Sequence, residues 1–422
     1  MENHAYALQK LGRRRHASAQ ADRALSIWRR AAAEFPAEFL PKLAAGETWT
    51  ARFRLDNDES ERAAGHMERG VHHYCSLIDA GSDGLVNLKI ALHRYARALH
   101  RVRLCARAAV AMEDAVYLAR QLFETDAAQH HFRLADTLRD QAWLYSDAGR
   151  RRDAVDAGRE ALDVLTDLIA SDDEDRRSTL ADYLDSQADS LAEVGQLTEC
   201  LELNARAVAL WEQLAIERET TAVDLAWSLW HRARWLAERD GDVATLPISQ
   251  RAIEILQRTS ENRPDAAKYL ADALMDHGLH LARPGWHTQA LDHNNRALEL
   301  WEALAADKPR EHVPGLAVCL RRRATHLAES LDIEAALDTS SRAIELTEKA
   351  VEWTRRRHLP DLAACCHEAA LLWRGRDSDQ ARTLAGRAVR LYAESVRHEP
   401  DIFDDRLAQA RITAALIEND DR

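Results

Sequence analysis

The 422-residue sequence predicts an all-α protein, a solenoid of nine antiparallel helix pairs followed by a capping helix. Three observations lead to this prediction. The chain has only 15 Gly and 9 Pro, too few for a sandwich or barrel with many turns, so long helices are favoured. A small residue recurs along the whole chain at intervals of 45 or 46 residues. A second small residue stands 19 residues before each of these, which indicates two helices in every repeat.

The first landmark lies on the second helix of each repeat, here called helix B. It is a small residue, usually preceded by Arg and followed by an aliphatic side chain. Its nine copies are Ala24, Gly70, Ala115, Ala161, Ala207, Ala252, Ala297, Ala343 and Ala388. An aromatic residue follows four positions later in five copies, as Trp28, Tyr74, Trp211, Trp301 and Tyr392. Because residues four apart share one helix face, we expect these rings to lie in the core.

The second landmark is the small residue of the first helix, here called helix A. Its copies are Ala5, Ala51, Ala96, Ala142, Ala188, Ala233, Gly278, Ala324 and Ala369. Apolar residues usually stand four positions before it and three positions after it, as Leu184 and Leu191 do around Ala188. These offsets share one helical face, so helix A is predicted to be amphipathic. The small side chain would let two helices approach closely.

Proline marks the ends of several repeats, because it cannot continue a helix. Pro36, Pro264, Pro309 and Pro400 each stand twelve residues after a helix B landmark. With this register, a single solenoid spans residues 1–422, and its repeats end near residues 37, 83, 127, 173, 219, 264, 309, 355 and 400. Residues 401–422 are predicted to form a capping helix and a polar tail, which terminal repeats need for solubility.

The repeat has a small residue in helix A, Ala in helix B, an aromatic residue four positions after that Ala and Pro twelve positions after it. This pattern resembles the tetratricopeptide repeat over essentially the whole chain. The unit is about eleven residues longer than the usual 34. It looks like the long-helix repeats that accompany nucleotide-binding or caspase-like modules in actinobacterial proteins. The resemblance implies a bacterial protein and a right-handed superhelix whose concave surface, lined by one flank of the A helices, binds another protein.

Charge and composition argue against several other classes of protein. The net charge of −13 leaves no basic surplus for nucleic acid. The first residues contain no apolar segment of the kind found in a signal peptide. No uncharged apolar run is long enough to span a membrane. The six cysteines show no CxxC spacing, so we expect reduced thiols and a cytoplasmic location.

The sequence contains no recognisable catalytic, cofactor or metal motif. It has no GxxxxGK[ST] phosphate loop and no HExxH helix. The adjacent pairs His72–His73 and His130–His131 point to different helix faces and are interpreted as ordinary surface or interhelical histidines. We therefore predict no enzyme activity, no cofactor and no metal site.

A candidate binding groove follows from the helical wheel of helix A. Positions six and three before the small residue, and one after it, lie on the flank away from the packing positions. Trp and Arg are the types that anchor interfaces, and Asp and Arg can pair with charged groups of a partner. The same side chains could instead form a purely structural ladder between successive A helices. The predicted partner-binding residues are Arg97, Asp136, Arg139, Trp143, Asp182, Asp185, Asp189, Trp227, Trp230, Arg234, Asp272 and Arg321.

The sequence thus favours a protein-interaction scaffold whose groove, centred on repeats four to six, binds an extended or helical segment of a partner. A separately encoded effector, such as a caspase-like protease, is one such partner. The alternative is a regulator whose solenoid changes curvature when a peptide or another ligand binds. An enzyme with its active site in the groove is the third hypothesis.

Overall fold

The computed structural model describes residues 13–55, 59–166, 174–241, 243–283, 285–397 and 400–420, together with residues 5, 7, 8, 10, 11 and 57. Within these residues every regular element is a helix, which confirms the predicted all-α solenoid of repeats. The chain divides into two compact units, Met1–Ala170 and Ser171–Arg422, and each is described by itself. None of the described helices is long and apolar enough to cross a membrane.

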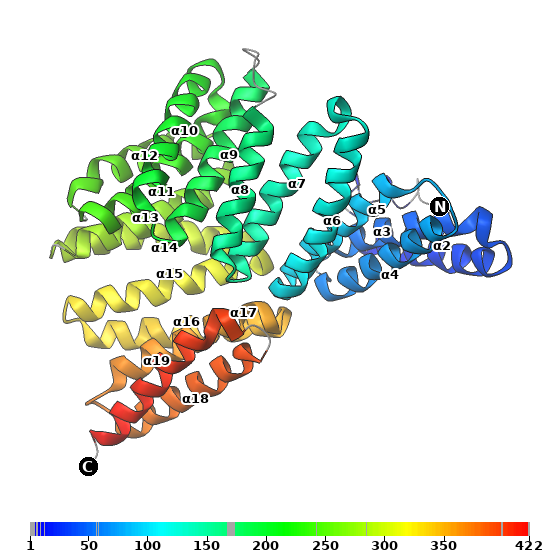
Figure 1. Ribbon diagram of the computed structural model, residues 1–422. Helices are drawn as coiled ribbons and strands as arrows, with labels where there is room; N and C mark the ends of the chain where they lie inside the picture. The colour runs from blue at the N-terminus through cyan, green and yellow to red at the C-terminus, as the bar shows by residue number, and fades with distance from the viewer. Residues whose placement is uncertain are drawn as a thin grey trace. The chain divides into compact units, whose positions relative to one another are not determined.

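The first unit contains α2 (Arg14–Glu34) and three hairpins, each formed by a helix A and the helix B that follows it (Figure 1). The hairpins are α3 (Pro36–Leu55) with α4 (Ser60–Asp79), α5 (Leu85–Arg101) with α6 (Cys105–Thr125), and α7 (Ala127–Asp147) with α8 (Arg151–Thr166). Within this unit, α2, α4 and α6 also pack on the helix A that follows each of them. Most of the predicted first helix A and the predicted repeat end near residue 173 lie outside the described residues.

The second unit continues the same order of elements. Its hairpins are α9 (Glu174–Glu193) with α10 (Leu197–Glu217), α11 (Ala222–Asp240) with α12 (Leu246–Ser260), α13 (Ala267–Ala282) with α14 (His287–Asp307), α15 (Pro309–Glu329) with α16 (Ile333–Trp353), and α17 (Arg355–Trp373) with α18 (Ser378–Val396). Short 3-10 turns, η1 (Glu219–Thr221), η2 (Val243–Thr245) and η3 (Pro264–Ala266), precede α11, α12 and α13. A final helix, α19 (Pro400–Asn419), packs on α18. The predicted tail residues 421 and 422 lie outside the described residues.

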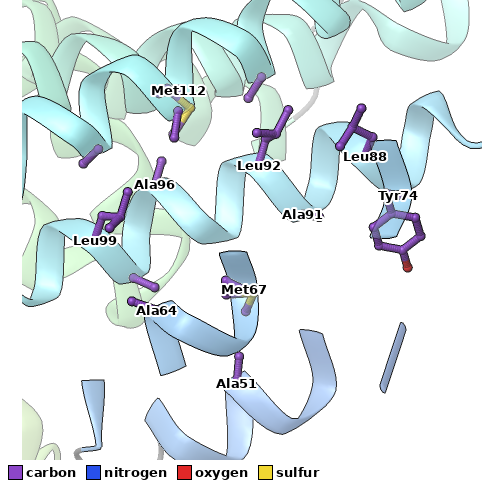
Figure 2. Close-up of a cluster of buried hydrophobic side chains, with 14 of the residues drawn as sticks. Ala51, Ala64, Met67, Tyr74, Leu88, Ala91, Leu92, Ala96, Leu99 and Met112 are labelled. Atoms are coloured by element: carbon purple, nitrogen blue, oxygen red, sulfur yellow. The ribbon is translucent and has the colours of Figure 1, made fainter. Parts of the chain in front are cut away.

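The small landmarks lie where helices cross, and all eighteen are buried. Figure 2 shows this packing in the first unit, where Ala51 and Ala96 lie among larger apolar side chains such as Met67, Leu92 and Met112. There is no room for a larger residue at some of these crossings. A Cβ atom added to Gly278 would stand 3.0 Å from Asn294 Oδ1 and 3.1 Å from the Ala290 carbonyl oxygen. Close approach of helices A and B therefore explains why the landmark stays small.

The aromatic landmarks of helix B fill the space against neighbouring A helices. Four of the five rings are buried, and Trp28 is half-buried and stacks on Phe39 of the next helix A with ring centroids 6.0 Å apart. The ring of Trp301 lies where a side chain at Gly315 of α15 would otherwise stand. The core positions predicted for these rings thus agree with the structure. The four repeat-ending prolines also supply the first residue of α3, η3, α15 and α19, where the missing N–H costs little.

Candidate functional site

The predicted groove residues belong to A helices of both units. Four of them lie on α5 and α7 of the first unit, and eight lie on α9, α11, α13 and α15 of the second unit. Each group is therefore considered within its own unit.

In the first unit, polar side chains join α5 to α7. His93 Nε2 lies 2.8 Å from Asp140 Oδ2, and Arg97 Nη1 lies 3.8 Å from the same oxygen. Arg139 donates to Asp136 Oδ1 over 3.0 Å within α7. Burial alone would raise the pKa of Asp140, but the hydrogen bond from His93 and the charges of His93 and the nearby arginines outweigh it, so this pKa is lowered. Three predicted groove residues, Arg97, Asp136 and Arg139, thus take part in pairs within the protein.

Trp143 is the most apolar of the predicted residues in the first unit. Its side chain is 42% exposed, and its ring lies against His100 with centroids 4.2 Å apart. His100 in turn pairs with Asp147. Trp143 and Arg97 are therefore the exposed members of this group, whereas Asp136 and Arg139 are half-buried beside the polar contacts that join α5 to α7.

Similar polar contacts join successive A helices of the second unit. Trp230 Nε1 on α11 donates to Asp276 Oδ2 on α13 over 2.9 Å. Arg322 on α15 pairs with the other oxygen of Asp276. Arg321, a predicted groove residue, pairs with Glu368 on α17. Because the partners stand 46 or 47 residues apart, each pair links one repeat to the next.

Asp185 does not have the exposed position that the helical wheel assigns to it. It is 2% exposed and accepts hydrogen bonds from Trp211 Nε1 at 2.9 Å, Asn204 Nδ2 at 3.0 Å and Ser228 Oγ at 2.8 Å. Burial raises its pKa to about 7, and the three hydrogen bonds only partly oppose that rise. The position three residues before the small landmark faces the interior here because α10 and α11 close over it.

The remaining predicted residues on α9 are Asp182 and Asp189, and the one near the start of α11 is Trp227. Asp189 Oδ1 lies 3.0 Å from His231 Nδ1, and the His231 ring stacks on Trp227 with centroids 3.9 Å apart. Trp227 is half-buried and Asp182 is exposed. The contact between Asp189 and His231 therefore joins α9 to α11, as the other polar pairs join successive A helices.

Three predicted residues, Trp230, Arg234 and Asp272, come together around one hollow of about 560 Å³ between α11, α13 and α15. Sequence reasoning did not select Asp276 and Arg322, although both also line the hollow. Their signal was present as the spacing of 46 residues that separates Trp230 from Asp276 and Asp276 from Arg322. The full lining is Trp230, Arg234, Trp235, Ala237, Glu238, Asp272, Met275, Asp276, Leu279, His280, Arg283, Val318 and Arg322.

The charged groups of this hollow differ in how they are held. Asp276 is fixed by Trp230 and Arg322. Asp272 and Arg234, by contrast, have no hydrogen-bond or salt-bridge partner among the residues that the structure describes. Burial raises the pKa of Asp272 to about 6, and the charge of Asp276 adds to the rise. The hollow therefore presents an acceptor and a guanidinium that an incoming group can pair with, beside a preorganised indole.

Metal binding and nucleophilic catalysis would each need a particular cluster of side chains. Within the described ranges, no three His, Cys, Asp or Glu side chains lie close enough together to hold a metal ion. Ser249 Oγ lies 2.7 Å from His277 Nδ1, but both residues are buried, and burial lowers the pKa of His277 to about 4. This pair lies between α12 and α13, helices of successive hairpins, and neither residue lines the hollow.

Comparison with protein-family models gives no match, and comparison with curated proteins gives none either. Solved structures do resemble the chain. The apo form of the quorum sensor NprR from B. thuringiensis matches with a TM-score of 0.51 and 12% identity, over 86% of this chain and 96% of the other. Aspartyl phosphate phosphatase F from Bacillus subtilis matches with a TM-score of 0.50 and 13% identity, over 89% and 93% of the two chains. At such identities the likeness concerns the fold, and this chain is an α-solenoid of tetratricopeptide-like repeats.

Proposed function

We propose that this protein is a protein-interaction scaffold that binds a segment of a partner in the hollow between α11, α13 and α15. The observation that carries this proposal is that Trp230 and Arg234 of α11 and Asp272 of α13 line one hollow, which α15 completes with Val318 and Arg322. Each of these side chains recognises a different kind of group. A surface that combines all three, beside apolar side chains, is suited to a peptide segment.

The expected chemistry of the segment follows from these residues. The Trp230 ring offers a large apolar area and is already oriented by its bond to Asp276, so little conformational freedom is lost on binding. Arg234 can clamp a carboxylate of the partner, while Asp272 can accept from an ammonium or guanidinium group. We therefore expect a segment with an apolar anchor flanked by one acidic and one basic side chain.

The fold alone does not decide the function. Chains of this fold include a quorum sensor and an aspartyl phosphate phosphatase, so the same framework serves different purposes. The proposal therefore rests on the hollow. Among the described residues that line the hollow there is no Ser, Thr, Cys or Lys side chain.

Affinity capture from the native host with the full chain tests the proposal. Arg234→Glu reverses the charge of an exposed hollow residue, and Arg258→Glu makes the same change on an exposed residue of α12. We expect mass spectrometry to find a partner enriched by the wild type and by Arg258→Glu, and lost with Arg234→Glu. The resemblance to actinobacterial arrays makes a caspase-like effector one candidate. Equal recovery by both variants would refute this assignment of the hollow.

The alternative is a regulator that changes curvature when a peptide binds. It would use the same hollow, so the two hypotheses differ in the shape of the bound protein. Small-angle scattering with the segment mapped from the captured partner separates them. A dose-dependent change in the radius of gyration would favour the regulator, and an unchanged radius would favour the scaffold.

A further inference from the structure

A second cavity, of about 210 Å³, lies in the first unit between α5, α6 and α7. It is separate from the hollow of the second unit. Its wall is largely apolar, and its polar side chains are all of the cationic or imidazole type, with no carboxylate among them. The lining residues are Val86, Lys89, Ile90, Ala119, Leu122, His130 and Arg133.

Lys89 is the unusual member of this wall. It is half-buried, and among the described residues it has no hydrogen-bond or salt-bridge partner. Burial lowers the pKa of Lys89, an effect that Arg133 strengthens and that the charges of Asp136 and Asp140 oppose. Lys89 thus lines a cavity whose wall is almost entirely apolar, and no described residue gives its ammonium group a contacting counter-ion.

The nearby carboxylates are already engaged elsewhere. Asp136 accepts from Arg139 at 3.0 Å, and Asp140 lies 2.8 Å from His93 Nε2. The exposed Arg133 guanidinium also lacks a hydrogen-bond or salt-bridge partner among the described residues. A charge that is partly removed from water and has no contacting partner is costly, and such groups at a pocket frequently mark a functional site.

We propose that this cavity binds a small apolar carboxylic acid. Its carboxylate would pair with Lys89 and Arg133, and its hydrocarbon part would lie against Val86, Ala119 and Leu122. The size agrees with this class of ligand, because a cavity of about 150 Å³ is enough to hold benzene. The space suits a phenyl ring or a chain of about six carbons. The site does not depend on the function proposed for the second unit.

Isothermal titration calorimetry on the full chain, with 3-phenylpropionate and hexanoate as probes, tests this inference. Each acid is compared with its neutral primary amide, which keeps the shape and removes the charge. We expect each acid to bind at one site per chain, at least about tenfold more tightly than its amide, because hydrogen bonds between charged groups are the stronger ones.

Variants assign the binding to this cavity. Lys89→Met keeps the length and the apolar stem, and it should remove the advantage of the acid over the amide. Ala119→Leu should fill the cavity and weaken both ligands, with circular dichroism confirming that the chain still folds. Lys349→Met makes the same change as Lys89→Met at an exposed position of α16 and should leave both affinities unchanged.

Three results would overturn the inference. One is equal affinity for an acid and its amide, which would show that charge plays no part. Another is unchanged acid binding in Lys89→Met, which would place the ligand elsewhere. The third is no binding of either acid at concentrations up to about 10 mM, which would show that the cavity does not accept this class of ligand.

Discussion

Asp185 on α9 stands three residues before the small landmark of its helix, and Asp272 on α13 stands six residues before the landmark of its own. Burial raises the pKa of Asp185 to about 7 and that of Asp272 to about 6. Their surroundings differ. Asp185 accepts hydrogen bonds from three side chains of α10 and α11, whereas Asp272 borders an open hollow and has no such donor among the described residues. The comparison indicates that a carboxylate is available to a partner where the fold supplies no hydrogen-bond donor for it.

Removing the Asp185 carboxylate should have the largest effect on stability. Asp185→Ala leaves the donors of Trp211 and Ser228 without this acceptor and removes one of the acceptors of Asn204, so we expect the free energy of unfolding to fall by about 3 kcal/mol. Urea denaturation measures this change. Asp338→Ala, at an exposed position of α16, should change it by less than about 0.5 kcal/mol. Equal effects of the two substitutions would mean that the buried network contributes nothing to stability.

The register that places both aspartates can be tested at the small landmark of α9. Ala188 is fully buried, so Ala188→Leu should overpack the crossing and cost about 1–3 kcal/mol. Ala205→Leu makes the same change at an exposed position of α10 and should cost less than about 0.5 kcal/mol. Thermal or urea unfolding of both variants gives the comparison. Similar stabilities would show that the register of helix A is wrong.

The pH dependence of stability should distinguish Asp272 directly. Its pKa is raised to about 6 in the folded state, so ionised Asp272 costs stability at pH values above that. We expect Asp272→Asn to stabilise the protein by about 1–2 kcal/mol near pH 8, with the gain fading as the pH falls from about 6 to about 4.

The comparison of wild type and variant isolates this group. His277, whose pKa is lowered to about 4, acts in the opposite direction, because stability is lost as the pH falls below the unfolded pKa of histidine. That contribution is common to both proteins and cancels in their difference. A gain that does not change with pH would contradict the raised pKa of Asp272.

Much of the fold could be predicted from the sequence because the same physical constraint is repeated nine times. Each crossing needs a small residue, and the landmarks from Ala5 to Ala388 are buried in the structure. Each helix B needs bulk against the next helix A, which Trp301 supplies beside Gly315. Regular spacing makes such positions visible without any knowledge of their neighbours.

The candidate site could be predicted only in part. The wheel of helix A selected Trp230, Arg234 and Asp272, and the structure brings these three around one hollow. It also selected Asp185, whose burial depends on side chains of α10 and α11 that the wheel of one helix does not contain.

The unselected residues show the same limit. Asp276 and Arg322 become visible only when residues one repeat apart are compared as pairs. Lys89 gave no signal, because a lone lysine on a helix shows nothing of the cavity beside it.

The affinity of the captured partner for Arg234→Glu, measured together with the Tm of the variant, tests the binding role of the hollow most directly. Arg234 is exposed and unpaired among the described residues, so its loss should leave the fold intact. We expect the affinity to fall at least about thirtyfold, with the Tm within about 2 °C of the wild type and with Arg258→Glu unchanged in both. An unchanged affinity for Arg234→Glu would contradict the proposed site.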